Sequence, residues 1–376
     1  MKTAVFPLSA DPFHNGHLHN IAYCLGQFDR LYVAIGVHPT KNPVFSVEER
    51  VFLTKKVLSS SSLDLEKLVV EPMNGILRNY AYTKGADYII RGCRNSADLD
   101  YEQVVANFNL DFGINTLIVP TTNHLRDLSS TLVKSIVKEA GLVHDYVHPA
   151  IKQALEERVR GYSLIGVTGN MGSGKTTFCK RFVDYARSQN IGAYHIDFDE
   201  MVRGLYAGES PMCCRVRQEI LSAFGPDAYK DGQINRRVLS AIVFGDDGKR
   251  KLLADIVRIP SRVAFEEELR KHKGIVLVDA AYFTEYNMLP IVNYNMMIVH
   301  CPEEERYRRI EERDNMSREE VEKKTSCQHP YEMKKRLILQ AQEKVKHGFF
   351  LEVEANGCYD FPKIASNLKE AFPLLR

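Results

Sequence analysis

The sequence predicts an α/β protein with two domains, each a parallel β-sheet flanked by helices. Short apolar runs alternate with helical patterns along all 376 residues, and this alternation indicates parallel sheets with helical crossovers. The length also exceeds that of one typical domain. A glycine-containing motif follows the first expected strand of each half, at the carboxyl edge where such sheets bind ligands.

The expected elements divide the chain at Arg160–Gly161, into domains of residues 1–160 and 161–376. In the first half the expected strands are residues 3–7, 31–37, 88–90 and 116–119, and the expected helices are 17–28, 48–58, 98–112 and 129–140. A charged helical segment at 150–160 precedes the boundary. In the second half the expected strands are 163–168, 193–196, 275–278 and 296–299, with a charged, helix-rich stretch at 302–346.

Composition argues against several classes of protein. With 44% hydrophobic and 26% charged residues, the chain can fill ordinary cores, and its net charge of +2 gives no support to a nucleic-acid partner. We find no signal segment and no long apolar run, so we expect a cytoplasmic protein without a membrane span. The eight cysteines show neither a CxxC pair nor a zinc spacing. We expect reduced packing residues, although the adjacent Cys213 and Cys214 leave redox activity open.

Residues 169–176, GNMGSGKT, fit the pattern GxxxxGK[ST] throughout. An expected strand precedes the motif and an expected helix follows it, which is the context that a phosphate-binding loop requires. The glycines let backbone N–H groups surround phosphates, Lys175 can reach the β- and γ-phosphates, and the Thr176 hydroxyl can ligate Mg²⁺. The residues expected to contact ATP here are Gly169, Asn170, Met171, Gly172, Ser173, Gly174, Lys175, Thr176 and Thr177.

Two aspartates, Asp197 and Asp199, follow the next expected strand. A carboxylate at this place can orient Mg²⁺ or take a proton from an acceptor hydroxyl. We expect Asp197 to serve the metal, and the residues alone leave the role of Asp199 open. The alternative is structural, because Asp199 precedes a helical pattern and is a candidate N-cap.

Further motifs in the second half follow in order: DGQINR at 231–236, Asp279 with Glu285, RDNMS at 313–317, Gln328 and Asn356-Gly357. With the phosphate-binding loop and the aspartate pair, they make residues 163–357 resemble dephospho-coenzyme A kinases, P-loop kinases with a helical lid. The resemblance implies that Asp199 is the catalytic base and that Arg313 of the lid neutralises charge on the transferring phosphoryl group. It also implies that Asn235 and Arg236 lie at the acceptor site.

The second half departs from that family at two places. Ile259 stands where the family usually has His, and Ala281 begins a segment where it usually has Pro-Leu-Leu. Both departures concern the acceptor pocket rather than the phosphate chemistry.

The first half carries DPFHNGH at residues 11–17, after its first expected strand. Gly16 permits a tight turn that places His14 and His17 at the start of a helix. Imidazole donors there can stabilise charge that develops on a phosphate. Two alternatives remain open: a metal site, for which no third ligand stands at suitable spacing, and a structural pair that caps the helix.

More motifs follow this pair: HPTKNPVFSVEER at 38–50, IRGCR at 90–94, DLDYE at 98–102 and LSSTLVK at 128–134. Together they make residues 3–155 similar to bacterial-type phosphopantetheine adenylyltransferases, HxGH nucleotidyltransferases with a Rossmann-like fold. The resemblance implies that His17 stabilises the pentacovalent phosphorus, while Lys41 and Arg91 hold the acceptor phosphate during catalysis. It places Ser9 beside that phosphate and Leu77 at the pantetheine arm. The residues it places at ATP are Ser9, His14, His17, Gly92, Arg94, Glu102, Ser129, Ser130 and Thr131.

The first half also departs from its family. Leu8 and Ala10 stand where the family usually has Gly and Phe, and His14 stands where it usually has Thr. We expect the bulk of Leu8 beside the phosphate site to tune or weaken the adenylyltransferase activity.

Together the resemblances imply a bifunctional transferase for the last two steps of coenzyme A synthesis, with Mg²⁺ and with ATP as co-substrate. It would adenylylate 4′-phosphopantetheine to dephospho-coenzyme A, releasing pyrophosphate, and then phosphorylate the ribose 3′-hydroxyl. One alternative is another mononucleotide adenylyltransferase fused to a nucleoside kinase, against which the segments at 39–41 and 90–94 argue. A second is a kinase with a non-catalytic, nucleotide-binding first domain, which Leu8 and Ala10 motivate. The expected partners are these small molecules and, through the first domain, further copies of the chain.

Overall fold

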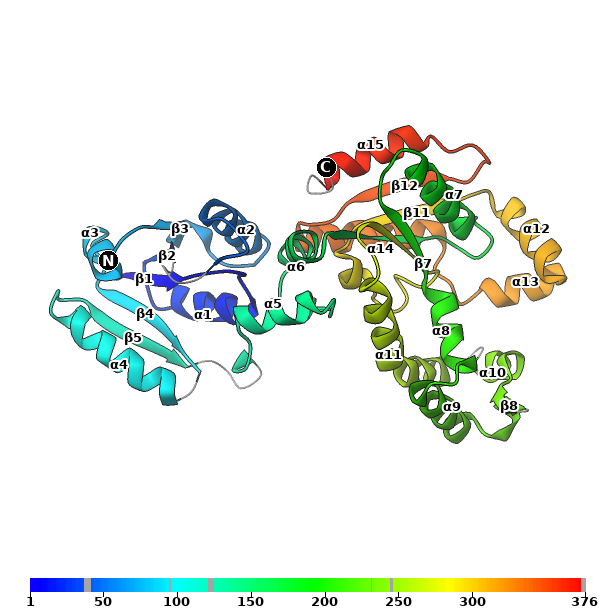
Figure 1. The fold of residues 1–376 in the computed structure, drawn as a ribbon, viewed down its shortest axis with the longest axis horizontal. Coiled ribbons are helices and arrows are strands. Elements are labelled where there is room, and N and C mark those ends of the chain that lie inside the picture. The colour runs from blue at the N-terminus through cyan, green and yellow to red at the C-terminus, as the bar shows by residue number, and fades with distance from the viewer. Residues whose placement is uncertain (37–41, 95, 121–124, 231, 244–245, 373–376) are drawn as a thin grey trace. The chain divides into compact units, whose positions relative to one another are not determined.

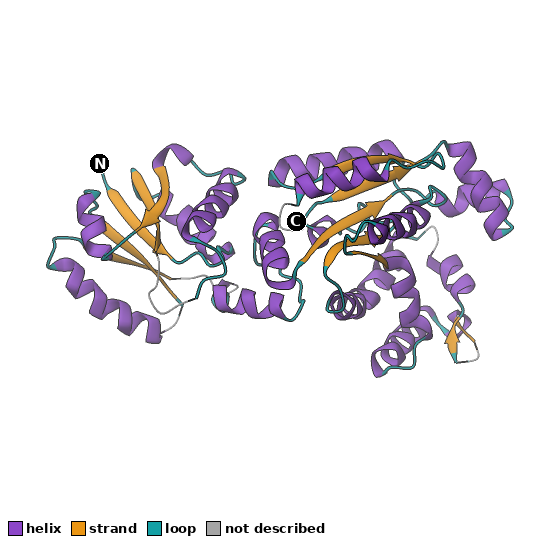
Figure 2. Cartoon of the chain, turned by 45° about the horizontal axis from the view of Figure 1, so that its top comes forward, coloured by secondary structure: helices purple, strands orange, loops and turns teal. Residues whose placement is uncertain are grey.

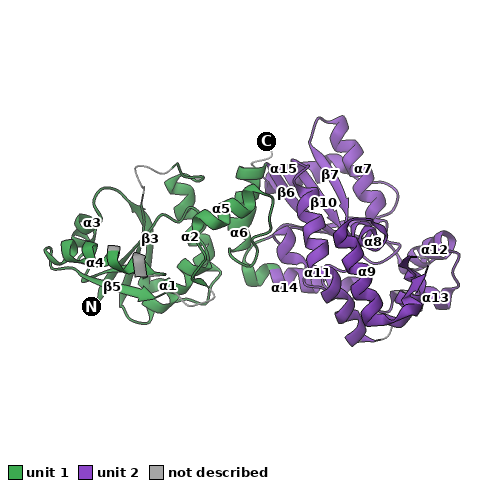
Figure 3. Ribbon diagram, turned by 60° about the horizontal axis from the view of Figure 1, so that its bottom comes forward, with its two compact units in different colours: residues 1–160, 342–347 green, residues 161–341, 348–376 purple. Residues whose placement is uncertain are grey.

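The computed structural model describes residues 1–36, 42–94, 96–120, 125–230, 232–243 and 246–372 (Figure 1). They form two compact units (Figure 3). The first unit contains Met1–Arg160 with Gln342–His347, and the second contains Gly161–Ala341 with Gly348–Arg376. Each unit is built around a five-stranded parallel sheet flanked by helices, as predicted (Figure 2). Among the described helices, none combines the length and apolar character needed to cross a membrane.

The sheet of the first unit has the strand order β3-β2-β1-β4-β5. Its strands are β1 (Thr3–Leu8), β2 (Arg30–Gly36), β3 (Leu68–Met73), β4 (Tyr88–Cys93) and β5 (Asn115–Pro120). The α-helices described in this unit are α1 (Asn15–Leu25), α2 (Val47–Ser59), α3 (Leu77–Thr83), α4 (Ser96–Leu110), α5 (Ser130–Lys138) and α6 (Pro149–Leu155). A π-helical turn, Glu156–Arg160, follows α6.

Both faces of this sheet are buried, because helices cover each side. Ala4 and Phe6 pack into one core, whereas Val5 packs into a second core with Ala34 and Ile89. Alternate residues of a strand point to opposite faces, so continuous apolar strands are what a doubly covered parallel sheet requires.

The strand order reverses beside β1, and the sheet opens there. β1 pairs with β2 along its whole length, but it pairs with β4 only at Ala4 and Val5. The carboxyl ends of β1 and β4 therefore separate, which leaves the crevice at which sheets of this type bind their ligands. The histidine motif follows β1 directly and lies at this crevice.

The strands expected in the first half are confirmed as β1, β2, β4 and β5, and the expected helices as α1, α2, α4 and α5. The prediction missed β3 and α3. β3 carries Pro72, which interrupts a strand pattern, but β3 lies at the edge of the sheet, where a missing N–H is tolerated.

The sheet of the second unit has the order β12-β11-β6-β10-β7. Its strands are β6 (Tyr162–Thr168), β7 (Ala193–Asp197), β10 (Gly274–Asp279), β11 (Met296–His300) and β12 (Phe350–Glu354), and a separate hairpin pairs β8 (Tyr229–Lys230) with β9 (Gln233–Ile234). The described helices are α7 (Lys175–Ser188), α8 (Phe198–Ala207), α9 (Pro211–Phe224), α10 (Arg236–Val243), α11 (Asp247–Leu269), α12 (Glu303–Asp314), α13 (Arg318–Thr325), α14 (Tyr331–Val345) and α15 (Phe361–Ala371).

Several hydrophobic clusters of described residues stabilise the second unit, and two of them involve its sheet and its helices α8 to α11. One lies between the sheet and helices α7 and α15, with Phe178, Phe182 and Leu368 fully buried. The other joins α8, α9, α10 and α11 around Val216 and Ile220. The predicted strands are confirmed as β6, β7, β10 and β11, whereas β12, α15 and the hairpin were not predicted.

Candidate functional sites

The two histidines of the first unit fold onto each other at the start of α1. His14 is the N-cap, and its Nδ1 accepts the Gly16 N–H at 3.2 Å, while Nδ1 of His17 accepts the His14 N–H at 3.3 Å. The rings stack with their centroids 3.6 Å apart. A Cβ at Gly16 would lie 3.0 Å from the His14 ring, so any larger residue there would press on that ring. The capping alternative therefore describes the local geometry correctly, without excluding a catalytic role.

These hydrogen bonds determine the chemistry of the two rings. Burial, with a smaller contribution from Arg94, lowers the pKa of His14 from 6.5 to about 4. Burial, with His14 and Arg94 nearby, also holds the pKa of His17 well below its ordinary value. Both rings are thus neutral near pH 7. Since each Nδ1 accepts a backbone N–H, the ring proton lies on Nε2, which leaves a donor suited to a phosphate oxygen.

A buried arginine holds the loop between β1 and α1. Arg50 is 2% exposed, and its Nη1 donates to the carbonyl oxygens of Ser9 at 2.6 Å and Gly36 at 2.9 Å. These two residues lie just after β1 and at the end of β2, so one guanidinium fixes the carboxyl ends of two neighbouring strands. Ser9 itself is exposed. Sequence reasoning assigned no role to Arg50, and its place in a helical pattern gives no signal for one.

Asp11 is the second buried anchor of this loop. Its carboxylate accepts the N–H groups of Val44 and Phe45 at 3.0–3.1 Å and the Lys134 ammonium at 2.7 Å. Leu8, three residues before Asp11, is half-buried at the end of β1. Ala10 is buried in the left-handed region, with φ 46°. These two departures from the family thus lie at the end of β1 and in the turn that follows it.

Arg91 and Glu102 form a two-pronged ion pair. Nε and Nη2 of Arg91 donate to the two carboxylate oxygens of Glu102, each at 2.6 Å. Glu102 is buried, whereas the Arg91 side chain is 27% exposed. The sequence predicted Arg91 at the acceptor phosphate and Glu102 at ATP. In the structure the two side chains bind each other, so Glu102 can orient Arg91 toward a phosphate.

The other residues expected at ATP surround the end of β4 and the start of α5. Nε of Arg94 pairs with Asp98 at 3.0 Å, and a Cβ on Gly92 would lie 2.8 Å from the Asn20 amide, so this strand end needs glycine. At α5, Ser129 accepts the Leu132 N–H as N-cap. The remaining expected residues lie as follows: Ser130 donates to the Pro12 carbonyl at 2.8 Å, Thr131 is exposed, and Leu77 is half-buried at the start of α3.

One residue predicted for the first site lies outside the described residues. Lys41, expected to hold the acceptor phosphate, lies in the segment 37–41. Its role stays a prediction from the sequence.

The phosphate-binding loop of the second unit connects β6 to α7. Gly169, Gly172 and Gly174 have φ values of 152°, 81° and 92°, which favour glycine. A Cβ on Gly169 would also lie 2.1 Å from the Val299 carbonyl oxygen. Lys175, 9% exposed, opens α7. The loop thus has the conformation that turns backbone N–H groups inward around an anion.

The two aspartates after β7 have separate places. Asp197 is the N-cap of α8, and its Oδ1 accepts the Glu200 N–H at 2.8 Å. The structural alternative for Asp199 is therefore wrong, because the helix begins at Phe198 and Asp199 lies in its first turn. Oδ2 of Asp199 accepts the Ala281 N–H at 3.4 Å. Burial, opposed by Lys175, raises the pKa of Asp199, as a proton acceptor for a hydroxyl requires.

Asp279 is the residue that lies beside Thr176. It ends β10, and its Oδ2 accepts the Thr176 hydroxyl at 2.5 Å. Burial alone would raise the pKa of Asp279, but His195 and Lys175 outweigh it and hold this pKa below its ordinary value. Sequence reasoning assigned the metal to Asp197 and missed this contact, although Asp279 directly follows an expected strand.

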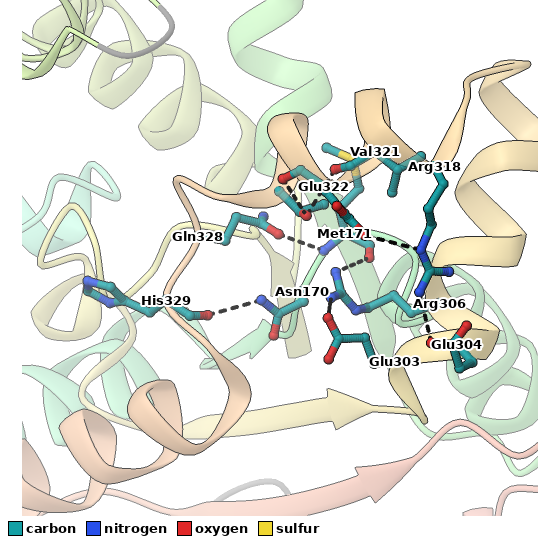
Figure 4. A network of polar contacts seen from close by, with 11 residues as sticks. Asn170, Met171, Glu303, Glu304, Arg306, Arg318, Val321, Glu322, Gln328 and His329 are labelled. Carbon is teal, nitrogen blue, oxygen red and sulfur yellow. Dashed lines mark hydrogen bonds and ion pairs between the residues drawn. The ribbon is translucent and has the colours of Figure 1, made fainter.

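A polar network joins the phosphate-binding loop to the segment between α12 and α14 (Figure 4). Gln328 Oε1 accepts the Met171 N–H at 2.9 Å, and Asn170 donates to the His329 carbonyl at 3.0 Å. Arg306 donates to the Met171 carbonyl at 3.3 Å. These hydrogen bonds connect the loop to α12 and to the segment that precedes α14. Arg313, the lid residue named from the sequence, pairs with its neighbour Asp314 at 2.7 Å and is exposed.

The acceptor side contains a buried ion pair that sequence reasoning missed. Nζ of Lys334 donates to the Ala281 carbonyl at 2.7 Å and to Glu285 at 2.6 Å, and Lys334 is fully buried. The backbone of Ala281, a departure from the family, thus donates a hydrogen bond to Asp199 and accepts one from Lys334. The other departure, Ile259, is 63% exposed on α11.

The two residues expected at the acceptor site lie together at the start of α10. Asn235 Oδ1 accepts the Val238 N–H at 3.3 Å, and Arg236 is the first residue of the helix. This places Asn235 as a helix cap, and its contact with an acceptor stays a prediction.

Two families match the chain. A cytidylyltransferase-like family matches residues 5–136 and a dephospho-CoA kinase family matches residues 163–342. A phosphopantetheine adenylyltransferase of Arthrobacter sp. (strain FB24) is 40% identical over 157 residues, which are 41% of this chain and 96% of that protein. One from Chromobacterium violaceum is 42% identical over 144 residues, 38% of this chain and 85% of that protein.

Among solved structures, a dephospho-CoA kinase from Campylobacter jejuni is similar with a TM-score of 0.32 and 19% identity. That match covers 56% of this chain and 98% of the kinase. The region matched by the cytidylyltransferase-like family includes His17, and the region matched by the dephospho-CoA kinase family includes Lys175 and Asp279.

Proposed function

The chain belongs to the phosphopantetheine adenylyltransferase family through its first unit, and from this premise and its dephospho-CoA kinase region we propose that it performs the last two steps of coenzyme A synthesis. In the first step an adenylyl group passes from ATP to 4′-phosphopantetheine, giving dephospho-coenzyme A and pyrophosphate. In the second step another ATP phosphorylates the ribose 3′-hydroxyl of that product. The chain is a bifunctional transferase that uses ATP in both reactions.

The first reaction needs positioning and charge stabilisation, and no general base. A phosphate oxygen of 4′-phosphopantetheine attacks the α-phosphorus of ATP, and the bond to pyrophosphate breaks. His17, neutral with its proton on Nε2, donates to the oxygen on which charge develops. Arg91, oriented by Glu102, holds the attacking phosphate with Lys41. Ser9 and the Ser129–Thr131 turn bind the nucleotide.

The second reaction needs a proton acceptor beside the phosphate-binding loop. Asp199 takes the proton of the 3′-hydroxyl, whose oxygen then attacks the γ-phosphorus of ATP. Burial raises the pKa of Asp199 and so makes it a better base than an exposed aspartate. The loop N–H groups and Lys175 hold the phosphates, and Arg313 approaches them when the lid closes.

The kinase site fits a Mg²⁺ ion. Oγ1 of Thr176 and Oδ2 of Asp279 are 2.5 Å apart and supply the oxygen ligands that this ion prefers. We assign Asp279 this role in place of Asp197, whose carboxylate caps α8. The ion would neutralise charge on the ATP phosphates.

One observation carries the proposal: each phosphate motif follows the carboxyl end of β1 or β6, where the strand order of its own sheet places the ligand. The test is a panel of acceptors given separately to the purified chain with ATP. We expect pyrophosphate from 4′-phosphopantetheine but not from nicotinamide mononucleotide, and ADP from dephospho-coenzyme A but not from nucleosides. Turnover of nicotinamide mononucleotide and nucleosides instead would contradict the assignment.

We also propose that the chain is cytoplasmic and self-associates through the first unit. Val104 and Phe108, one turn apart on α4, are 57% and 58% exposed, and an exposed apolar helix face of this kind is typical of a protein interface. Light scattering of the chain tests this, and a strict monomer at micromolar concentration would contradict it.

A further inference from the structure

A thiol, an imidazole and a carboxylate meet beneath the phosphate-binding loop. Cys179 lies on α7, His195 on β7, and Asp279 ends β10. One ligand atom from each lies within 4.8 Å of the other two. Their positions in the sequence form no metal-binding spacing, and only the parallel sheet brings them together. Neither Cys179 nor His195 has a role in the two proposed reactions.

The imidazole of this cluster lacks the partner that a buried ring nitrogen needs. Nε2 of His195 is buried and has no hydrogen-bond partner among the described residues. Oδ2 of Asp279 lies 3.6 Å away, which is longer than a hydrogen bond. A buried polar atom without a partner reduces stability, and such atoms in native proteins call for an explanation, a bound ion among them.

The three donor types select a particular class of ion. Thiolate, imidazole and carboxylate are the protein ligands of Zn²⁺, whereas Mg²⁺ binds oxygen. Zinc–ligand distances of about 2.0–2.3 Å put tetrahedral ligand atoms about 3.5 Å apart, so small side-chain movements bring the cluster to that geometry. We propose that Cys179, His195 and Asp279 bind Zn²⁺ and that this ion inhibits phosphoryl transfer in the second unit.

Inhibition follows from a shared oxygen. Oδ2 of Asp279, the atom nearest His195 in their ion-pair contact, also accepts the Thr176 hydroxyl at 2.5 Å. An ion that takes this oxygen competes with Thr176 and with the Mg²⁺ assigned there. On binding, the Cys179 thiol loses its proton to solvent, and no oxidation or reduction is involved. The inhibition rests on the proposed kinase activity, whereas the binding does not.

Binding is tested by Co²⁺ titration of the full chain, because a thiolate ligand gives Co²⁺ a charge-transfer band in the near ultraviolet. We expect this band to saturate at one ion per chain and to be lost in Cys179→Ser. In His195→Gln we expect the band only at Co²⁺ concentrations about tenfold higher or more. Cys213→Ser, which removes another buried thiol of this unit, should leave the band unchanged. A band that survives in Cys179→Ser, or none in the wild type, would overturn the site.

Inhibition is tested by Zn²⁺ titration of both reactions in the same chain. We expect Zn²⁺ to stop phosphorylation of dephospho-coenzyme A and to leave pyrophosphate release in the first reaction unchanged. Cys179→Ser and His195→Gln should raise the half-inhibitory Zn²⁺ concentration about tenfold or more. Equal inhibition of wild type and both variants would overturn the inhibitory role. Absence of kinase activity in all three, with the Co²⁺ band present, would reject the proposed function while supporting the metal site.

Discussion

Thr176 donates a 2.5 Å hydrogen bond to Asp279, which joins the phosphate-binding loop to the carboxyl end of β10. Both oxygens lie where a Mg²⁺ ion on the ATP phosphates would find its protein ligands. The contact spans 103 positions of the sequence, and it moves the metal assignment from Asp197 to Asp279.

We predict that Asp279→Asn lowers the kinase kcat about a hundredfold or more, because the lost charge weakens Mg²⁺ positioning. The matched control is Asp197→Asn. Asparagine caps a helix about as well as aspartate, so this control should change the rate about twofold or less. Initial rates of ADP formation with dephospho-coenzyme A check both variants. A larger loss of kcat in the control than in Asp279→Asn would mean that Asp197, and not Asp279, binds the metal.

The pH profile of the kinase step tests Asp199 as base. Burial raises its pKa above the ordinary value, and the carboxylate must be deprotonated to accept a proton. Hence kcat/KM should fall as pH drops through this raised pKa and stay level above it. Asp199→Asn should lower kcat about 10²–10⁴-fold and remove the acidic limb from the residual rate. An acidic limb that persists unchanged in this variant would assign the limb to another group.

The Lys334–Glu285 pair tests how the acceptor side is supported. Lys334 is fully buried, with Nζ 2.6 Å from Glu285. Lys334→Ala leaves a mostly buried carboxylate unpaired, so it should reduce the free energy of unfolding by about 3–5 kcal/mol. The double variant with Glu285→Ala should lose less than the sum of the two single losses. Urea unfolding of the four proteins measures this, and strict additivity would mean that the two charges do not interact.

The environment of His148 predicts that the stability of the protein depends on pH. It caps α6 through Nδ1, and its Nε2 lies 3.0 Å from the Val345 carbonyl oxygen. Burial lowers its pKa from 6.5 to about 4. Below pH 6.5 His148 is protonated in the unfolded chain, whereas in the folded chain it stays neutral down to about pH 4. Stability from this group is therefore complete above pH 6.5 and is lost as pH falls to 4.

Between pH 7 and pH 5 the loss from His148 amounts to about 2 kcal/mol. His148→Asn keeps a capping side chain and should show a smaller decrease by that amount. Urea midpoints at the two pH values measure the difference. Equal decreases in wild type and variant would mean that His148 is not held neutral in the folded protein.

Local patterns predicted much of the fold and the position of both sites. The strand, glycine turn and helix around His17 and around Lys175 are contiguous in the sequence, so apolar periodicity and glycine spacing were enough. The missed elements lacked such a signal, since β3 contains Pro72 and the strands of the β8–β9 hairpin have two residues each.

Contacts between distant segments could not be predicted in the same way. Asp279 reaches Thr176 because β10 lies between β6 and β7 in the sheet. The order of strands in a sheet cannot be predicted from any one segment of the sequence. Asp197, and not Asp199, caps the helix because α8 begins at Phe198, one residue before Asp199. The position of a helix boundary therefore decides which of two nearby aspartates serves as the cap.

The central claim is that two independent sites act in sequence, and a mass-resolved assay with 4′-phosphopantetheine, ATP and Mg²⁺ tests it most directly. The wild type should form dephospho-coenzyme A and then coenzyme A. Lys175→Ala should stop at dephospho-coenzyme A, and His17→Ala should form neither product but still convert supplied dephospho-coenzyme A to coenzyme A. If either substitution abolished both reactions in a folded protein, or if the wild type converted only supplied dephospho-coenzyme A, the account would be contradicted.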